Sequence, residues 1–149
     1  MKPYGKQWMT AAALFSFAVF AQATPAGTGT QIEDGTGPEW IYKDCVKFEA
    51  GSGGSMHVTN AKGATIETEF SGTGIELYAK QDAKSGSVDI YIDDILVAQV
   101  NAYDKGDLWK NKIFEKDGLA PGKHKLKIIQ TDTKGLKLDF IKVYSNLLG

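Results

Sequence analysis

The sequence predicts an all-β protein, folded as a jelly-roll β-sandwich of about eight or nine antiparallel strands. Three observations predict this class. Apolar and polar residues alternate with period two in many short segments. Turn signals rich in Gly separate those segments, and no segment carries a convincing helical stripe. Many short strands joined by such turns are typical of sandwiches and jelly rolls.

Two hairpins carry the clearest alternation. Residues 64–70 and 74–79 alternate, with Ile66, Phe70, Ile75, Leu77 and Ala79 as apolar positions, and Ser-Gly-Thr-Gly at 71–74 predicts a tight turn between them. The same pattern runs through 88–92 and 95–100, with Asp93 and Asp94 at the turn. Asp tolerates a left-handed backbone better than most residues, so this turn needs no Gly.

The remaining strands are expected on both sides of these hairpins. Residues 42–49 and 55–59 predict two strands around a Gly-rich turn, and Pro121-Gly122 predicts a turn that begins a strand over 123–130. A last strand is expected over 136–144. Its apolar phase shifts between Phe140 and Ile141, which indicates a bulge or burial on both faces.

The N-terminus has the pattern of a secretory signal peptide. Lys2 and Lys6 precede an apolar run over 11–21, and Ala-Gln-Ala at 21–23 fits a cleavage site. The run is shorter than the roughly 20 residues of a membrane span. We therefore expect a signal peptide over 1–23, a flexible leader over 24–36, one folded domain over 37–146, no membrane span, and secretion to the periplasm or the extracellular space.

Charge and cysteine content exclude several classes of partner and site. All basic residues are Lys, and without Lys2 and Lys6 the chain has a net charge of about −3. Nucleic-acid binders instead gather Lys and Arg on one face, so no nucleic-acid partner is expected. Cys45 is the single cysteine, which excludes an internal disulfide, and we interpret it as a small buried hydrophobe.

Four blocks of sequence resemble bacterial jelly rolls of the galactose-binding type. In order, they are FSGTGIELY at 70–78, GSVDIYIDD at 86–94, GLAPGKHKLKI at 118–128 and LDFIKV at 138–143. One departure is Asp94, which stands where the family's hairpin turn usually carries Gly. The resemblance implies a carbohydrate-binding module, because similar domains precede the catalytic domain of some carbohydrate esterases or belong to multidomain glycan-degrading enzymes. It therefore implies a glycan or polysaccharide partner, and a separate carbohydrate-active enzyme as a second one.

Aromatic residues in loops are the main candidates for a sugar site, since sugars stack apolar C–H faces on rings and offer hydroxyls to polar groups. Trp109 and Tyr103 are expected in a polar loop over 101–111, with Asp107 between them. The alternatives are that Trp109 plugs the end of the sandwich, a role as plausible as stacking, and that Tyr103 is structural, which we favour slightly.

Further candidates lie outside this loop. Tyr78 points away from the apolar side of its strand, either into solvent or under a loop, with Asp82 close behind it. His57 follows a Gly-rich turn, although a lone His is more often a satisfied surface group. His124 opens a strand in the third block and is read as structural. The predicted ligand contacts are Trp109, Tyr103, Tyr78, Asp82, Asp107 and His57.

Catalysis finds little support in the sequence. The two His residues lie in unrelated blocks, and no Gly-x-Ser-x-Gly, His-Glu-x-x-His or paired-Cys pattern occurs, so no catalytic residue, metal ligand or cofactor is assigned. A structural calcium ion would be sought at Asp139 with Glu33 or Asp34; we favour the alternative that these are ordinary surface acids. The leading hypothesis is a non-catalytic glycan-binding module. Its rival is a structural or protein-interaction sandwich of the cell surface or periplasm.

Overall fold

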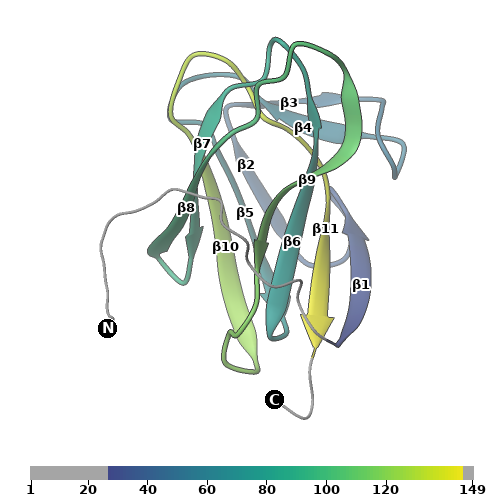
Figure 1. Cartoon of the computed structure of the whole chain (residues 1–149), viewed down its shortest axis with the longest axis vertical. Helices are drawn as coiled ribbons and strands as arrows, with labels where there is room; N and C mark the ends of the chain where they lie inside the picture. Colours follow the sequence, from purple (N-terminus) through teal and green to yellow (C-terminus); the bar gives the residue numbers. More distant parts are fainter. Residues whose placement is uncertain (1–26, 146–149) are drawn as a thin grey trace.

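The computed structural model describes residues 27–145, which form two antiparallel sheets (Figure 1). One sheet has the order β3-β4-β11-β6-β9, with β1 paired to β11, and the other has the order β2-β5-β10-β7-β8. The eleven strands are β1 (Thr28–Glu33), β2 (Trp40–Lys43), β3 (Cys45–Phe48), β4 (Met56–Thr59), β5 (Thr65–Ser71), β6 (Gly74–Gln81), β7 (Ser87–Ile92), β8 (Ile95–Asn101), β9 (Leu108–Lys116), β10 (Lys123–Gln130) and β11 (Lys137–Ser145). The chain therefore has the predicted all-β jelly-roll fold.

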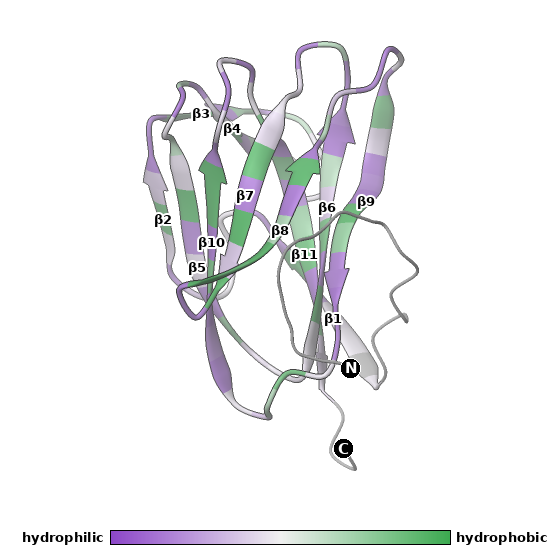
Figure 2. Cartoon of the chain, turned by 60° about the vertical axis from the view of Figure 1, so that its left-hand side comes forward, coloured by the Kyte–Doolittle hydropathy of each residue, from purple (hydrophilic) through white to green (hydrophobic). Residues whose placement is uncertain are grey.

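The core lies between the two sheets, and hydrophobic and hydrophilic residues alternate along the strands that enclose it (Figure 2). Ile66, Leu77, Ile90, Ile128 and Ile141 are all completely buried there. Burial of such a side chain contributes about 1.5–3 kcal/mol. Period-two alternation therefore assigned the buried face of these strands correctly.

The turn between β7 and β8 confirms that Asp replaces Gly. Asp93 and Asp94 both have positive φ angles, of 54° and 66°. The Asp93 carboxylate accepts a hydrogen bond of 2.8 Å from the Lys125 backbone N–H and pairs with His124 Nδ1 at 2.6 Å. His124 Nε2 lies 2.6 Å from the Ala120 carbonyl oxygen. His124 is thus structural, as the sequence indicated.

Three differences raise the number of strands above the expected eight or nine. Residues 28–33, expected in a flexible leader, form β1 because their backbone pairs with β11 over six positions. The strand expected over 42–49 is divided by Asp44, whose φ of 56° turns the chain between β2 and β3. Residues 108–116 form β9 where part of a loop was expected. The predicted signal peptide lies outside the described residues.

The last strand contains the predicted irregularity. The register between β11 and β6 shifts between Leu138 and Phe140. Leu138 and Ile141 consequently both join the core, while Phe140 stacks against Tyr78 on the outer side of the sheet. None of the described residues form a helix with the length and hydropathy of a membrane span.

Candidate functional site

Three loops meet at one end of the sandwich, the upper end in Figure 1. We call this end the rim; it consists of residues 82–86, 102–107 and 131–136 together with the first residues of β9. Backbone contacts join the loops: the Asp104 N–H donates to the Asp82 carbonyl at 3.1 Å, and the Gly86 N–H donates to the Gly135 carbonyl at 3.0 Å. Four of the six predicted ligand residues lie here: Asp82, Tyr103, Asp107 and Trp109.

Two aromatic rings of the rim are open to solvent. Trp109 and Tyr103 are each 48% exposed. An ammonium group lies over each ring, with Lys80 Nζ 4.4 Å from the Trp109 ring centroid and Lys134 Nζ 5.0 Å from the Tyr103 ring centroid. Such cation–π contacts restrain a ring and leave its other face available for stacking. With half of its surface exposed, Trp109 does not plug the end of the sandwich. Tyr103 also has the structural contacts that the sequence analysis favoured, since it bridges to Asp82 and lies near Lys134.

Trp109 is placed by an irregular edge strand rather than by a loop. In the pairing of β9 with β6, Leu108 lies opposite Gln81 and Asn111 opposite Ala79, so β9 carries one extra residue there. Lys110 accommodates the extra residue by adopting a positive φ angle of 53°. Bulges redirect side chains at sheet edges. The polar composition around Trp109 suggested a loop because a strand irregularity of this kind has no period-two signal.

Asp82 is the most heavily engaged residue of the rim. Its carboxylate pairs with Lys137 and with Lys80 at 3.5 Å, and it accepts hydrogen bonds from the Lys84 N–H at 2.9 Å and from Ser85 Oγ at 3.1 Å. Burial works to raise the pKa of Asp82, but the bonds from Lys137 and Lys84 outweigh it and lower the pKa to about 2. Asp82 is only 7% exposed, so it supports the rim from below.

Tyr78 lies away from the rim loops, on the outer side of the β6 strand. Its ring stacks on Phe140 with centroids 4.5 Å apart, and its hydroxyl donates to Glu76 Oε1 at 2.9 Å. Glu76 also accepts bonds from the Tyr144 hydroxyl at 2.8 Å and Lys112 Nζ at 3.1 Å. Burial would raise the pKa of Glu76, yet these donors together lower it. This cluster satisfies a buried carboxylate.

His57 belongs to a third location, on β4. Its Nδ1 lies 2.7 Å from Asp34 Oδ2, and its backbone N–H donates to the same oxygen at 2.6 Å. Its ring stacks on Tyr42 at 3.5 Å between centroids, and the Tyr42 hydroxyl donates to the other oxygen of Asp34. These contacts join Asp34, which directly follows β1, and Tyr42 of β2 to β4. The structure therefore does not bring His57 together with Trp109 and Tyr103.

Two of the three acids considered for calcium are buried, and the third, Glu33, is partly buried. Asp139 is completely buried and Asp34 is 3% exposed, which corrects the expectation of ordinary surface acids. Glu33 Oε1 and Asp139 Oδ2 are both buried without a hydrogen-bond partner, while Asp139 Oδ1 accepts from the Ser52 N–H at 2.7 Å. Burial raises the pKa of Asp139, and the charge of Glu33 adds to this.

These oxygens fit a hard cation, because calcium prefers carboxylate, carbonyl and water oxygens. No group of three or more His, Cys, Asp or Glu side chains suited to a metal occurs within residues 27–145. A calcium ion at Glu33 and Asp139 would therefore take its other ligands from the backbone and from water. Its role would be structural, since it would join β1 to β11 and to the loop around Ser52.

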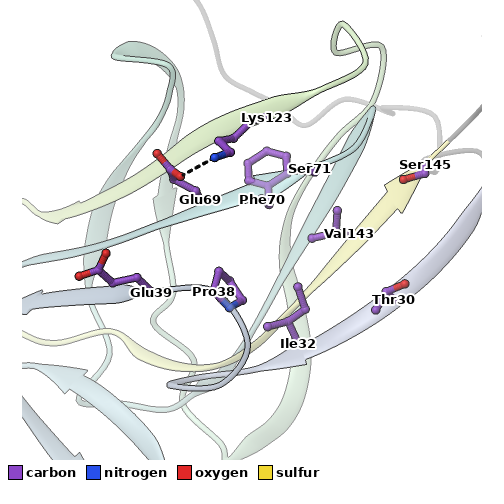
Figure 3. A pocket seen from close by; sticks show the side chains of 10 residues that line it. All are labelled: Thr30, Ile32, Pro38, Glu39, Glu69, Phe70, Ser71, Lys123, Val143 and Ser145. Carbon is purple, nitrogen blue, oxygen red and sulfur yellow. Dashed lines mark ion pairs between the residues drawn. The ribbon is translucent and has the colours of Figure 1, made fainter.

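A pocket of about 490 Å³ lies away from the rim, near the start of β10 (Figure 3). Ile32, Pro38, Phe70 and Val143 line its apolar part, and the ion pair of Glu69 with Lys123 lies beside it. Phe70 is the single aromatic residue among those that line the pocket, and it is only 4% exposed. The pocket therefore lacks an open stacking surface, and none of the six predicted ligand residues lines it.

Comparison with known sequences finds two enzymes that are each similar to this chain over a small part of their own length. No family model matches it. The chain is 38% identical over 76 residues to an A type blood N-acetyl-alpha-D-galactosamine deacetylase of Flavonifractor plautii. It is 32% identical over 93 residues to an A type blood alpha-D-galactosamine galactosaminidase of the same organism. The aligned segments cover 51% and 62% of this chain but only 10% and 8% of those proteins.

Solved structures confirm the fold. A family 35 carbohydrate-binding module from Clostridium thermocellum matches 80% of this chain and all of its own length, with a TM-score of 0.65 and 15% identity. A family 35 module from an environmental isolate matches 78% of this chain and 93% of its own, with a TM-score of 0.59 and 17% identity. A family two carbohydrate esterase from Cellvibrio japonicus matches 80% of this chain and 34% of its own, with a TM-score of 0.58 and 13% identity. The chain is thus a β-jelly roll that resembles carbohydrate-binding modules.

Proposed function

We propose that this protein is a non-catalytic carbohydrate-binding module whose glycan site is the rim. The observation that carries the proposal is the pair of half-exposed rings, Trp109 and Tyr103, each with one face restrained by a lysine. An exposed ring beside hydroxyl partners is what a sugar requires. Asp107, two residues before Trp109, supplies a carboxylate for those hydroxyls, whereas the Asn111 side-chain amide donates to Gln81 Oε1.

The relatives favour a galactose-type sugar as the first ligand to examine. Both matched enzymes of Flavonifractor plautii carry galactosamine in their names. The matched segment is a small part of each enzyme, as expected for a binding module beside a catalytic domain. We therefore propose a glycan with terminal galactose, galactosamine or N-acetylgalactosamine, presented on a polysaccharide or glycoprotein outside the cell, with a separate carbohydrate-active enzyme as the functional partner.

A role in binding rather than catalysis agrees with the chemistry of the rim. General acid–base catalysis needs a carboxylate poised to exchange a proton near neutral pH. The pKa of Asp82 is lowered to about 2, and its carboxylate is taken up by Lys137 and Lys80. Outside the rim, Glu76 likewise has a lowered pKa and is 2% exposed. These two carboxylates therefore support neighbouring side chains.

A glycan array followed by isothermal titration calorimetry tests the proposal. We expect dissociation constants between micromolar and millimolar, because an open stacking site spends much of its contact energy on ordering. A galactosamine-terminated, an N-acetylgalactosamine-terminated and a glucose-terminated oligosaccharide of equal length separate sugar type from general affinity. Absence of binding to any glycan at millimolar concentration would refute the proposal.

A protein-binding surface is the second candidate, and β3 favours it. Val46 and Phe48 are 40% and 51% exposed, and they lie two residues apart on one face of this edge strand. Edge strands with apolar side chains tend to be covered by a partner. Replacement of Phe48 by Ser would weaken such an interaction in a pull-down while leaving glycan binding unchanged.

A further inference from the structure

We infer that Asp82 is a positioning residue that fixes both aromatic rings of the rim, through Lys80 for Trp109 and through its own backbone for Tyr103. This inference rests on the proposed glycan site. It differs from the sequence-based expectation, in which Asp82 accepts hydrogen bonds from sugar hydroxyls.

The link to Trp109 passes through side chains. Asp82 Oδ2 lies 3.5 Å from Lys80 Nζ, and the same ammonium lies 4.4 Å from the Trp109 ring centroid. The Lys80 side chain is only 18% exposed, so it is held between the carboxylate and the indole. An ammonium in this position attracts the ring face by its charge, and the carboxylate keeps the ammonium there.

The link to Tyr103 passes through the main chain. Asp82 and Tyr103 form an isolated parallel β-bridge, and the Asp104 N–H donates to the Asp82 carbonyl oxygen at 3.1 Å. The Tyr103 ring lies under Lys134, whose ammonium also lies 3.5 Å from the Ala83 carbonyl oxygen. Asp82 and Ala83 therefore contact the two lysines that lie over the rings, Lys80 and Lys134.

The carboxylate itself is fully occupied. Lys137, Lys80, Ser85 and the Lys84 backbone all contact it, as described above, and the residue is 7% exposed. A sugar hydroxyl would have to displace one of these charged or backbone partners, which are the stronger class of hydrogen bond. Asp82 therefore acts on the ligand through the residues that it holds.

The test removes, one at a time, the two charges that link Asp82 to the Trp109 ring. Asp82→Asn removes the carboxylate charge, and Lys80→Met removes the ammonium but keeps an apolar stem over the ring. We expect each variant to raise the dissociation constant for an N-acetylgalactosamine-terminated oligosaccharide by about five-fold. The double variant should bind the glycan as tightly as whichever single variant has the lower affinity, because both changes break the same link. Lys80→Arg should restore binding, since Arg also pairs with carboxylates and stacks on rings.

Ring order provides a readout that needs no glycan. The heteronuclear NOE of the Trp109 indole N–H, assigned by its loss in Trp109→Phe, should fall in Asp82→Asn and in Lys80→Met and return in Lys80→Arg. The matched control is Asp93→Asn, which removes another ion-paired carboxylate that accepts a backbone N–H but lies in the β7–β8 turn, away from the rim. It should change neither ring order nor affinity.

The outcomes separate the two proposals. Unchanged indole order in Asp82→Asn and Lys80→Met overturns the positioning role, whatever the glycan result. Additive losses of affinity in the double variant overturn it as well. If the wild-type protein binds no glycan while indole order depends on Asp82, the proposed function fails and the positioning of the ring stands. If Asp82→Asn does not fold, Lys80→Met still decides the matter, because it leaves the pair of Asp82 with Lys137 in place.

Discussion

The two ends of the sandwich use the same residue types for different purposes. At the β7–β8 turn, Asp93 and His124 tie a hairpin to the start of β10, and the one ring in contact, Phe70, is buried against His124. At the rim, Lys80, which Asp82 pairs with, and Lys134 instead lie over rings that remain half exposed. Charged groups that satisfy only one another stabilise a turn, whereas charged groups that restrain an exposed ring prepare a surface for a ligand.

The largest expected effect concerns Trp109. Because it is the larger of the two open rings, Trp109→Ala should weaken glycan binding by at least about tenfold, in line with aromatic hot spots. The free energy of unfolding of this variant should differ from that of the wild type by no more than about 0.5 kcal/mol, since the Trp109 side chain is half exposed. Calorimetry and thermal unfolding measure the two effects. Phe48→Ala, at a similarly exposed ring on β3, is the control; equal loss of affinity in both variants would contradict a site at the rim.

Calcium should produce the next largest effect, at the buried carboxylates of β1 and β11. Binding at 100 times the dissociation constant contributes about 2.7 kcal/mol, so the melting temperature should rise by several degrees when calcium replaces a chelator. Asp139→Asn should abolish this rise. In chelator, the variant should be at least as stable as the wild type, because it removes a buried carboxylate whose Oδ2 has no hydrogen-bond partner, while an amide oxygen can still accept from the Ser52 N–H. Differential scanning calorimetry that shows no calcium response in the wild type would refute the site.

Between pH 4 and pH 9, the β7–β8 end should respond to pH, whereas the stabilisation from Asp82 at the rim is lost only below this range, as pH falls toward about 2. Burial alone lowers the pKa of His124, but Asp93 and the Ala120 carbonyl raise it above 6.5. The hydrogen bond from His124 in turn lowers the pKa of Asp93 below 3.8. The stabilisation from His124 is complete below 6.5 and is lost as pH rises through its folded-state pKa. That from Asp93 is complete above 3.8 and is lost as pH falls through its own.

The pair should therefore contribute most between about pH 4 and pH 6. The difference in melting temperature between wild type and His124→Gln should be greatest in that window and should shrink by pH 9. A difference that stays constant from pH 4 to pH 9 would show that His124 acts only through packing. Glycan affinity of His124→Gln at pH 6 should equal that of the wild type.

The smallest expected effect belongs to Tyr78. Tyr78→Phe removes one of the donors to Glu76 but keeps the stack on Phe140. We expect a loss of about 1 kcal/mol in the free energy of unfolding and less than about a two-fold change in glycan affinity, because the ring lies outside the rim loops. A larger effect on affinity than on stability would extend the glycan site along β6.

Local patterns predicted the fold well because the face that a strand buries depends on how apolar and polar residues alternate within that strand. Ile75, Leu77 and Ala79 are completely buried as period two required, and two Asp residues do form the β7–β8 turn. The pattern failed for β1, whose single apolar residue, Ile32, gives no alternation. That strand exists through backbone pairing with β11, which lies more than 100 residues later.

The site was predicted less completely because its contacts join distant parts of the chain. Exposed Trp109 and Tyr103 could be proposed from their polar neighbours. The occupation of Asp82 by Lys137 depends on residues 55 positions apart, and the burial of Asp139 depends on the loop that contains Ser52. No local signal reports such pairs, so residues that support a ring cannot be told from residues that touch a ligand.

The extra residue of β9 determines which way the Trp109 ring faces, so its loss would change the surface that the rim presents to a ligand. Successive side chains of a strand alternate between its two faces, so deleting Lys110 would make the pairing with β6 regular between Leu108 and Asn111 and turn the indole toward a different side. Because β9 is an edge strand, such a deletion would leave the order of every other strand intact. Insertion or loss of one amino acid at this position could thus diversify sugar preference among descendants of the chain at little cost to folding.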